Sequence, residues 1–260
     1  MATVSRRGAL LGAVGAAAGG ALASCAGPGP TRRSGTLSSR HWPGRDVHWQ
    51  LAMPPGGHDD RRPMVVVLHG KGGDASHAFR IVHLDDHVQA TDLTVASVDG
   101  GDYYWHARRA GVDPGAMVAD DFLPMLRRLT GYAGKVAFLG WSMGGYGSLL
   151  LASQLGPDQV GAVVAESAAL WTDAGLSAPG AFDDREDFIE HDVFRRTDVL
   201  SRIPVRLDCG RSDPFFPGNR AFAKALPSAE LTFDEGGHTG SYWRDHGRAQ
   251  LEWVARTLRA

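Results

Sequence analysis

The chain has little cysteine and little excess charge. Cys25 and Cys209 are the only two cysteines among 260 residues, so no disulfide framework is being built. Lys and Arg number 27 against 29 Asp and Glu, which gives no reason to expect nucleic acid or a strongly anionic membrane as the main partner. With 43% hydrophobic residues, the composition is that of one globular domain of mixed class.

A long hydrophobic run is also missing. The apolar stretch over residues 9–23 is shorter and richer in glycine than a transmembrane helix of about 20 apolar residues. It follows Arg6-Arg7, and the two features together resemble a twin-arginine export signal. Leu22-Ala23-Ser24-Cys25 then resembles a bacterial lipobox, in which Cys25 is lipidated and becomes the mature N-terminus. The alternative is a plain signal peptide cleaved nearby, with Cys25 incidental.

These features divide the chain into three parts. We expect residues 1–25 to be the export signal, residues 26–45 a flexible tether rich in Pro and Ser, and residues 46–260 the folded domain. A lipidated Cys25 would hold the protein at the outer face of the membrane in a bacterial envelope, whereas a plain signal would leave it secreted. Cys209 would then be unpaired, as a small buried apolar residue on a strand.

Metal-ligand spacing is lacking as well. His83 and His87 share a helical face, but the glutamate of an H-E-x-x-H motif is absent between them. We therefore expect neither a metal site nor a cofactor. No internal repeat is visible, and the sequence does not fix the oligomeric state.

Short apolar runs alternate with longer helical patterns along the folded part. Strands are predicted over residues 47–53, 64–68, 93–98, 136–139, 160–165, 205–209 and 230–233. Helices are predicted over 75–90, 114–129, 144–155, 219–226 and 242–258. This alternation indicates an α/β fold with a mostly parallel sheet and helices on both faces. Residues 171–202 are short and acidic, and form either a small cap or a solvated loop.

The sequence Gly140-Trp141-Ser142-Met143-Gly144-Gly145 contains G-x-S-x-G between a predicted strand and a predicted helix. That context is the nucleophile elbow of an α/β-hydrolase, in which a sharp turn exposes the serine hydroxyl. Glycines are needed because the turn leaves no room for side chains beside the serine. Ser142 is therefore the candidate nucleophile, and a structural serine in a tight turn is the alternative.

A serine nucleophile needs a base, and this fold orders the residues as Ser, acid, His. His238 lies in a glycine-rich loop between the last strand and the last helix, whereas His191 and His246 are expected in solvated or structural roles. Asp213 follows the penultimate strand and is the candidate acid that orients the imidazole. Its rivals are Asp208, within the strand, and Asp234, close to His238 in the chain.

Acyl transfer also needs donors for the developing oxyanion. One should be the backbone N–H of Met143, the residue after the nucleophile. The second should come from His69-Gly70-Lys71-Gly72-Gly73, where glycines let backbone approach a ligand. Lys71 N–H is the first choice and Gly70 N–H the second, and a simple glycine turn is the alternative.

From about Asp46 to the C-terminus, the chain resembles the "putative esterase" branch of the α/β-hydrolases, which includes esterase D, feruloyl esterases and mycobacterial mycolyltransferases. Three segments carry most of the resemblance: 68–73, 140–147 and Gly236-Gly237-His238 with the following Tyr242-Trp243. Asp99-Gly100-Gly101-Asp102-Tyr103-Tyr104-Trp105 also looks like the aromatic loop that borders the acyl site in this branch.

The resemblance implies an acyl-enzyme on Ser142 that is passed to water by a hydrolase or to a sugar hydroxyl by a mycolyltransferase. The first hypothesis is a serine esterase acting on small-molecule esters or acylated glycolipids at the envelope. The second is acyl transfer to a sugar or glycerol hydroxyl, as in mycolyltransferases or diacylglycerol acyltransferases. The third is a silent fold that serves as a surface binding module, which the intact Ser142, Asp213 and His238 disfavour.

Overall fold

The computed structural model describes residues 29–56 and 59–260. The predicted twin-arginine signal and the predicted lipidation site at Cys25 lie outside these residues. Within them, no helix combines the length and the apolar character that a membrane span needs.

The described residues form one sheet of eight strands in the order β1-β2-β4-β3-β5-β6-β7-β8. The strands are β1 (Thr31–Ser38), β2 (Asp46–Met53), β3 (Met64–Leu68), β4 (Thr94–Val98), β5 (Val136–Trp141), β6 (Val160–Glu166), β7 (Val205–Gly210) and β8 (Glu230–Asp234). β2 pairs antiparallel with both β1 and β4, and every other pair is parallel. The carboxyl ends of six parallel strands therefore meet at one edge of the sheet.

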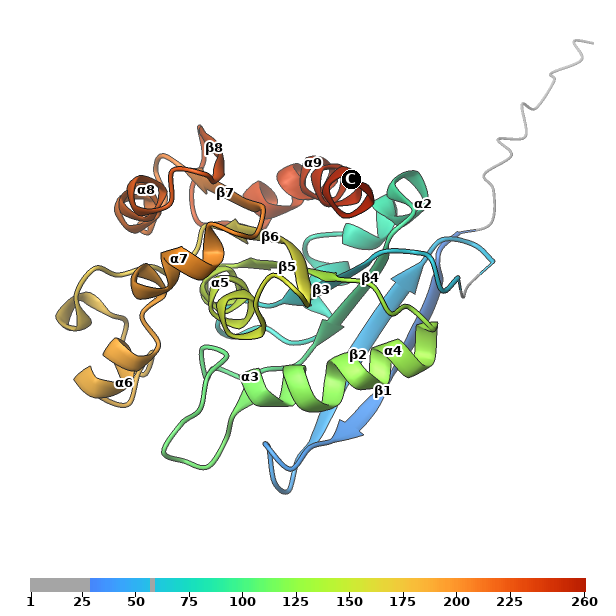
Figure 1. Cartoon of the computed structure of the whole chain (residues 1–260), viewed down its shortest axis with the longest axis horizontal. Coiled ribbons are helices and arrows are strands. Elements are labelled where there is room, and N and C mark those ends of the chain that lie inside the picture. The colour runs from blue at the N-terminus through green and yellow to red at the C-terminus, as the bar shows by residue number, and fades with distance from the viewer. Residues whose placement is uncertain (1–28, 57–58) are drawn as a thin grey trace, which may run out of the picture.

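Helices lie on both faces of this sheet (Figure 1). They are α1 (His77–Arg80), α2 (Val88–Thr91), α3 (Pro114–Met117), α4 (Leu123–Thr130), α5 (Met143–Leu155), α6 (Arg185–Glu190), α7 (Thr197–Leu200), α8 (Phe216–Ala225) and α9 (Gly240–Arg259). A π-helical turn over Val118–Phe122 joins α3 to α4. The predicted fold class, an α/β-hydrolase fold with a mostly parallel sheet, is confirmed.

The central strands are buried on both faces, as their unbroken apolar sequence predicts. Along β3, Met64, Val66 and Leu68 pack into the core beneath α3, α4 and α5. Val65 and Val67 point the opposite way, into the core beneath α1, α2 and α9. The period-two alternation of a strand thus supplies two hydrophobic layers from one run of sequence.

The prediction of a flexible tether over residues 26–45 is wrong for Thr31–Ser38, which form β1. This strand pairs with β2 along its whole length, from Thr31 opposite Met53 to Ser38 opposite Asp46. Its sequence is mostly polar because it lies at the edge of the sheet, and so it lacks the apolar pattern of a buried strand. The folded domain therefore begins before Asp46.

The predicted helix over residues 75–90 is also wrong in part, since it is broken into α1, a 3-10 turn over Leu84–His87, and α2. His83 has φ +57°, a left-handed conformation that interrupts a right-handed helix. The prediction that Cys209 is a small buried residue on a strand is confirmed, since Cys209 is fully buried on β7. Burial raises the pKa of its thiol, as expected for an inert core residue.

Residues 171–202 are ordered and carry α6, α7 and two 3-10 turns, Ala174–Leu176 and Val193–Arg196. We call this region the cap. Phe182 of the cap packs against Tyr104 and Tyr146, and the Lys71 ammonium donates to the carbonyl of Pro179 at 3.4 Å. Of the two alternatives, the small cap is therefore favoured over a solvated loop.

Candidate active site

Ser142 occupies the turn between β5 and α5, as the G-x-S-x-G pattern predicts. Its backbone has φ +57° and ψ −122°, a strained conformation for a residue with a side chain. Its N–H donates to the carbonyl of Glu166 at 3.0 Å, and its carbonyl accepts from Tyr146 and Ala169. The turn is thus held by neighbouring backbone while the serine is lifted at the carboxyl edge of the sheet.

Two glycines make this turn possible. A Cβ on Gly144 would lie 1.9 Å from the carbonyl oxygen of Leu68, and a Cβ on Gly140 would lie 2.3 Å from the carbonyl oxygen of Gly144. Both obstacles are main-chain atoms in the centre of the sheet, so they cannot move aside. The close approach of α5 to β3 therefore requires glycine at these positions.

His238 and Asp213 reach Ser142 from two other strand ends. His238 follows β8, and its Nε2 lies 3.0 Å from Ser142 Oγ. Asp213 follows β7, and its Oδ2 lies 2.9 Å from His238 Nδ1. Asp213 Oδ1 accepts the N–H of Phe215 at 2.8 Å, so both carboxylate oxygens are engaged. The three side chains form one hydrogen-bonded chain, with the acid buried and the imidazole partly exposed.

The rival residues have other partners. Asp208 is buried and accepts from Arg206 and Gln250, while Asp234 accepts from the Tyr242 hydroxyl at 2.7 Å. His246 contacts Asp234 at 3.0 Å. The other rival base, His191, lies in the cap beside Asp187. Within the described residues, none of these rivals forms a hydrogen bond with Ser142 or His238.

The candidate oxyanion donors flank the serine. Met143 is the first residue of α5, and the first N–H groups of a helix have no partner within it. A Cβ on Gly70 would lie 3.3 Å from Ser142 Cβ, which shows how near the 69–73 loop approaches. Gly72 N–H is already engaged by Asp102 at 2.6 Å, and Gly73 N–H by the Gly70 carbonyl at 3.0 Å. These two bonds fix the loop and leave Lys71 N–H and Gly70 N–H as the candidates.

Asp102 could not be recognised from sequence as a residue that shapes this loop, because it is 30 residues from Gly72 in the chain. The resemblance did single out its segment as an aromatic border of the acyl site. In the structure Trp105 is fully buried and packs on Gly147 of α5 and on Gly100. Tyr103 lines a hollow whose wall does not include Ser142.

The hollow that contains Ser142 is small, with a volume of about 290 Å³. Its wall consists of Gly70, Lys71, His77, Ile81, Trp141, Ser142, His238, Gly240 and Trp243. Trp243 stacks on Trp141 and meets the edge of the His238 ring, with centroids 5.1 Å apart. The space is at the lower end of small-molecule sites and has an apolar side.

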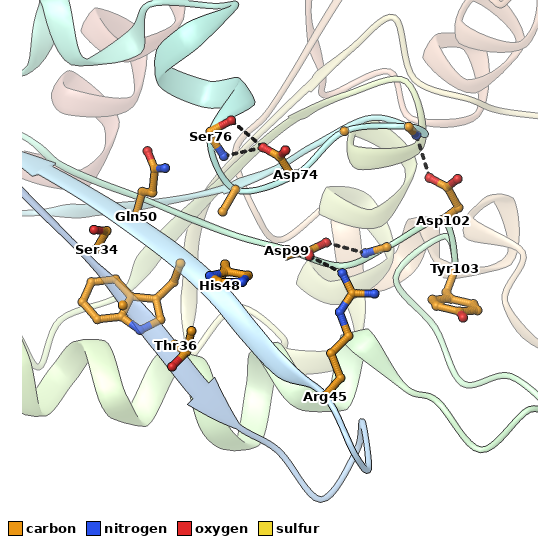
Figure 2. Close-up of a pocket in the computed structure, with 16 residues that line it drawn as sticks. Ser34, Thr36, Arg45, His48, Gln50, Asp74, Ser76, Asp99, Asp102 and Tyr103 are labelled. Atoms are coloured by element: carbon orange, nitrogen blue, oxygen red, sulfur yellow. Dashed lines mark hydrogen bonds and ion pairs between the residues drawn. The ribbon is translucent and has the colours of Figure 1, made fainter.

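A larger hollow of about 920 Å³ is lined by residues 72–76 of the loop whose Gly70, Lys71 and His77 line the hollow around Ser142 (Figure 2). We call it the polar groove. Its floor is β1 and β2, from which Ser34, Thr36, His48 and Gln50 face the space. Within the described part of the chain, the side chains of these four residues have no hydrogen-bond partner.

Charged residues line the opposite side of the polar groove. Arg45 donates to Asp99 at 2.7 Å, and Gly101 N–H donates to the same carboxylate (Figure 2). Burial alone would raise the pKa of Asp99, but the His69 ring, Gly101 N–H and the Arg45 guanidinium outweigh it and lower the pKa to about 2. Asp99 is therefore ionised at neutral pH and helps to fix the loop beside the active-site strands.

A buried acid lies behind the elbow. Glu166 ends β6 and is fully buried, and no described residue hydrogen-bonds its carboxyl oxygens. Burial first, and the neighbouring Asp208 second, raise the pKa of Glu166 well above its usual range. The raised pKa favours the neutral form of this carboxyl group behind the nucleophile turn.

Solved structures of other proteins share this fold. Among solved structures, a ferulic acid esterase superposes with a TM-score of 0.75 at 19% identity, covering 88% of this chain and 98% of its own. An S-formylglutathione hydrolase from Agrobacterium tumefaciens gives 0.76 at 17%, covering 88% and 96%. MPT51 (FbpC1) from Mycobacterium tuberculosis gives 0.69 at 16%, covering 86% and 97%. At these identities the likeness shows the fold alone.

Sequence comparison goes further than the fold. A search of curated proteins finds no match. The family model described as "Putative esterase", however, matches residues 41–256, which is most of the chain and includes every residue of the site described above. The chain therefore belongs to the "Putative esterase" family and is a carboxylic-ester hydrolase with the α/β-hydrolase fold.

Proposed function

We propose that Ser142, His238 and Asp213 are the catalytic triad of a serine esterase that works through an acyl-enzyme. The observation that carries this proposal is the continuous hydrogen-bonded chain from Asp213 Oδ2 through His238 to Ser142 Oγ. Asp213 holds the proton on His238 Nδ1, so that Nε2 presents its lone pair to the serine hydroxyl.

The reaction then follows from these positions. Ser142 Oγ attacks the ester carbonyl carbon while His238 Nε2 takes the hydroxyl proton. The N–H groups of Met143 and Lys71, or Gly70 in place of Lys71, stabilise the oxyanion. The C–O bond to the alcohol breaks as His238 returns the proton to the leaving oxygen. Water, deprotonated by His238, then attacks the acyl-enzyme and releases the acid.

The size of the hollow around Ser142 favours a short acyl group. A volume of about 290 Å³ leaves no room for a long acyl chain in an enclosed tunnel. We expect turnover of chromogenic esters to fall as the acyl chain lengthens.

The triad assignment is tested by Ser142→Ala, which removes the nucleophile but adds no bulk. We expect hydrolysis of a short chromogenic ester to be abolished with the fold intact by circular dichroism. Ser201→Ala is the matched control, since its hydroxyl bonds only to a nearby carbonyl in an exposed turn. Unchanged turnover by the Ser142 variant would refute the assignment.

Acyl transfer is the second candidate, and the polar groove favours it. A hydroxylated acceptor could bind where Ser34, Thr36, His48 and Gln50 present hydrogen-bonding groups with no protein partner. The test is to add trehalose or glycerol during ester turnover and separate the products. An acylated acceptor would establish transfer, whereas free acid alone would leave hydrolysis as the reaction. A silent binding module would give neither product.

Export and anchoring rest on sequence alone. We infer from Arg6-Arg7 and from Leu22-Ala23-Ser24-Cys25 that the protein is exported and held at the cell envelope by lipid on Cys25. Cys25→Ala should move the protein from the membrane fraction to the soluble fraction of cells. Equal membrane fractionation of the variant would contradict the anchor.

A further inference from the structure

Two histidines and an aspartate come together where the cap meets the body of the domain, away from Ser142, His238 and Asp213. His106 belongs to the segment between β4 and α3, Asp187 lies in α6, and His191 is the residue after α6. Their ligand atoms all lie within 4.8 Å of one another. The His106 side chain is fully buried, and those of Asp187 and His191 are almost so. We call these three residues the cap triad.

The hydrogen-bonding groups around His106 do not suit a neutral imidazole. Nε2 lies 3.1 Å from the carbonyl oxygen of Ala181, and Nδ1 lies 3.0 Å from that of Ala107 and 3.5 Å from Asp187 Oδ1. Each nitrogen thus faces oxygen acceptors, whereas a neutral ring carries only one N–H. If Nε2 donates to Ala181, the lone pair of Nδ1 points at oxygen atoms. A positively charged group between Nδ1 and these oxygen atoms would remove the mismatch.

The Nδ1 atom of His191 also faces oxygen acceptors. Its Nδ1 lies 2.8 Å from Asp187 Oδ1 and 3.0 Å from the Asp187 carbonyl oxygen. The two imidazoles are stacked, with ring centroids 4.3 Å apart. One carboxylate oxygen therefore lies beside a ring nitrogen of each histidine, in a buried setting where an unpaired charge is costly.

We propose that the cap triad is a binding site for a divalent transition-metal ion, with Zn²⁺ the best match. The ligands are His106 Nδ1, Asp187 Oδ1 and His191 Nδ1. A donor set of imidazole nitrogen and carboxylate oxygen suits Zn²⁺ and its first-row neighbours, and does not suit Mg²⁺ or Ca²⁺, which take oxygen ligands.

The distances fit such an ion. Zn–N and Zn–O bonds of about 2.0–2.2 Å in a tetrahedron place ligand atoms about 3.3–3.6 Å apart. The separation of 3.5 Å between His106 Nδ1 and Asp187 Oδ1 lies within that range, whereas the 2.8 Å between His191 Nδ1 and Asp187 Oδ1 is shorter. Only a small outward movement of His191 is needed to admit the ion.

The surroundings also fit. A metal-bound histidine usually donates its second N–H to a carbonyl or carboxylate, which fixes the ring. His106 Nε2 has the Ala181 carbonyl in that position. A ligand carboxylate is likewise held through its other oxygen, and Asp187 Oδ2 accepts the Asp183 N–H at 2.7 Å.

The ion would join the cap to the body of the domain. His106 comes from the segment that also carries Tyr104, and Phe182 of the cap stacks on the His106 ring. Arg108 binds Asp183 across the same junction at 2.8 Å. The sequence offered no indication of this site, because His106 is 81 positions before Asp187 and only Asp187 and His191 have helical spacing.

The experiment is titration of the purified, untagged protein with Zn²⁺ after treatment with a chelator. We expect saturable binding of one ion, a higher Tm, and, with Co²⁺ in place of Zn²⁺, the visible absorption of a tetrahedral site with nitrogen and oxygen ligands. Asp187→Asn and His191→Gln should each weaken binding by about 100-fold or more. His83→Gln is the control, since His83 is half-exposed and outside the cap, and it should bind as the wild type does.

Two results would overturn the proposal. Absence of Zn²⁺ binding to the folded wild type would mean that a proton, held between His106 and Asp187, supplies the positive charge. Wild-type affinity in folded Asp187→Asn and His191→Gln would place the ion elsewhere. Because the wild-type titration and the Co²⁺ spectrum need no variant, the test stands even if a substitution prevents folding.

Discussion

Asp213→Asn tests the electrostatic design of the triad, because it changes a charge but almost no volume. In the wild type, Asp213 Oδ1 accepts the Phe215 N–H at 2.8 Å while Oδ2 faces His238 Nδ1 at 2.9 Å. In the variant, the amide oxygen must stay on Phe215, since the opposite orientation would set an NH₂ group against that N–H. The NH₂ group therefore faces His238 and donates to Nδ1.

The consequence is the wrong tautomer of His238. Its proton moves to Nε2, which then donates toward Ser142 Oγ across 3.0 Å and cannot accept the hydroxyl proton. For this change in a Ser-His-Asp triad the expected loss in kcat is about 10⁴-fold. At about 1.36 kcal/mol per factor of ten, this corresponds to about 5.4 kcal/mol of transition-state stabilisation.

The assay is steady-state hydrolysis of a short chromogenic ester, with circular dichroism to verify folding. The matched control is Asp234→Asn, because Asp234 lies closer to His238 in the chain but binds Tyr242 and His246 instead. We expect kcat of the control variant to fall by less than about tenfold. If Asp213→Asn kept activity within about tenfold of the wild type, or if Asp234→Asn were equally damaging, the assignment of the acid would be wrong.

Two further predictions concern the frame around the site. Gly144→Ala places a methyl group 1.9 Å from the Leu68 carbonyl oxygen, so we expect it to lower the free energy of unfolding by about 3 kcal/mol or more. Urea denaturation measures this loss. If the variant were as stable as the wild type, α5 would not be so closely packed on β3. The pKa of Asp99 is lowered to about 2 in the folded protein, so its ionisation stabilises the fold above about pH 4 and this contribution is lost as the pH falls through about 2. Between about pH 5 and pH 2, the free energy of unfolding of the wild type should therefore fall by about 2 kcal/mol more than that of Asp99→Asn. Parallel plots of unfolding free energy against pH for the two proteins would contradict this.

The hydrogen-bonded arrangement of Ser142, His238 and Asp213, which we propose as the triad, could be predicted from the sequence because each residue stands in a short local pattern. Gly140 to Gly144 follows a buried strand and opens a helix, and His238 lies in a glycine-rich loop before the last helix. To predict Asp213 it was enough to know the order of the strands along the chain. Parallel strands end at one edge of a sheet, so residues that follow different strands meet there without any long-range information.

Features that depend on partners distant in the chain could not be predicted. β1 is polar and exists through its pairing with β2, so its sequence looks like a tether. His83 ends a helical pattern through a backbone conformation that composition does not reveal. The cap triad depends on how residues 171–202 fold back onto His106, and the helical spacing of Asp187 and His191 alone is common on charged helices.

The most direct test of the central claim is intact-protein mass spectrometry after treatment with a fluorophosphonate probe. We expect one adduct, mapped to Ser142, which should form much more slowly in Asp213→Asn. Absence of an adduct on the folded protein, or an adduct on another residue, would contradict the proposal that His238 and Asp213 activate Ser142.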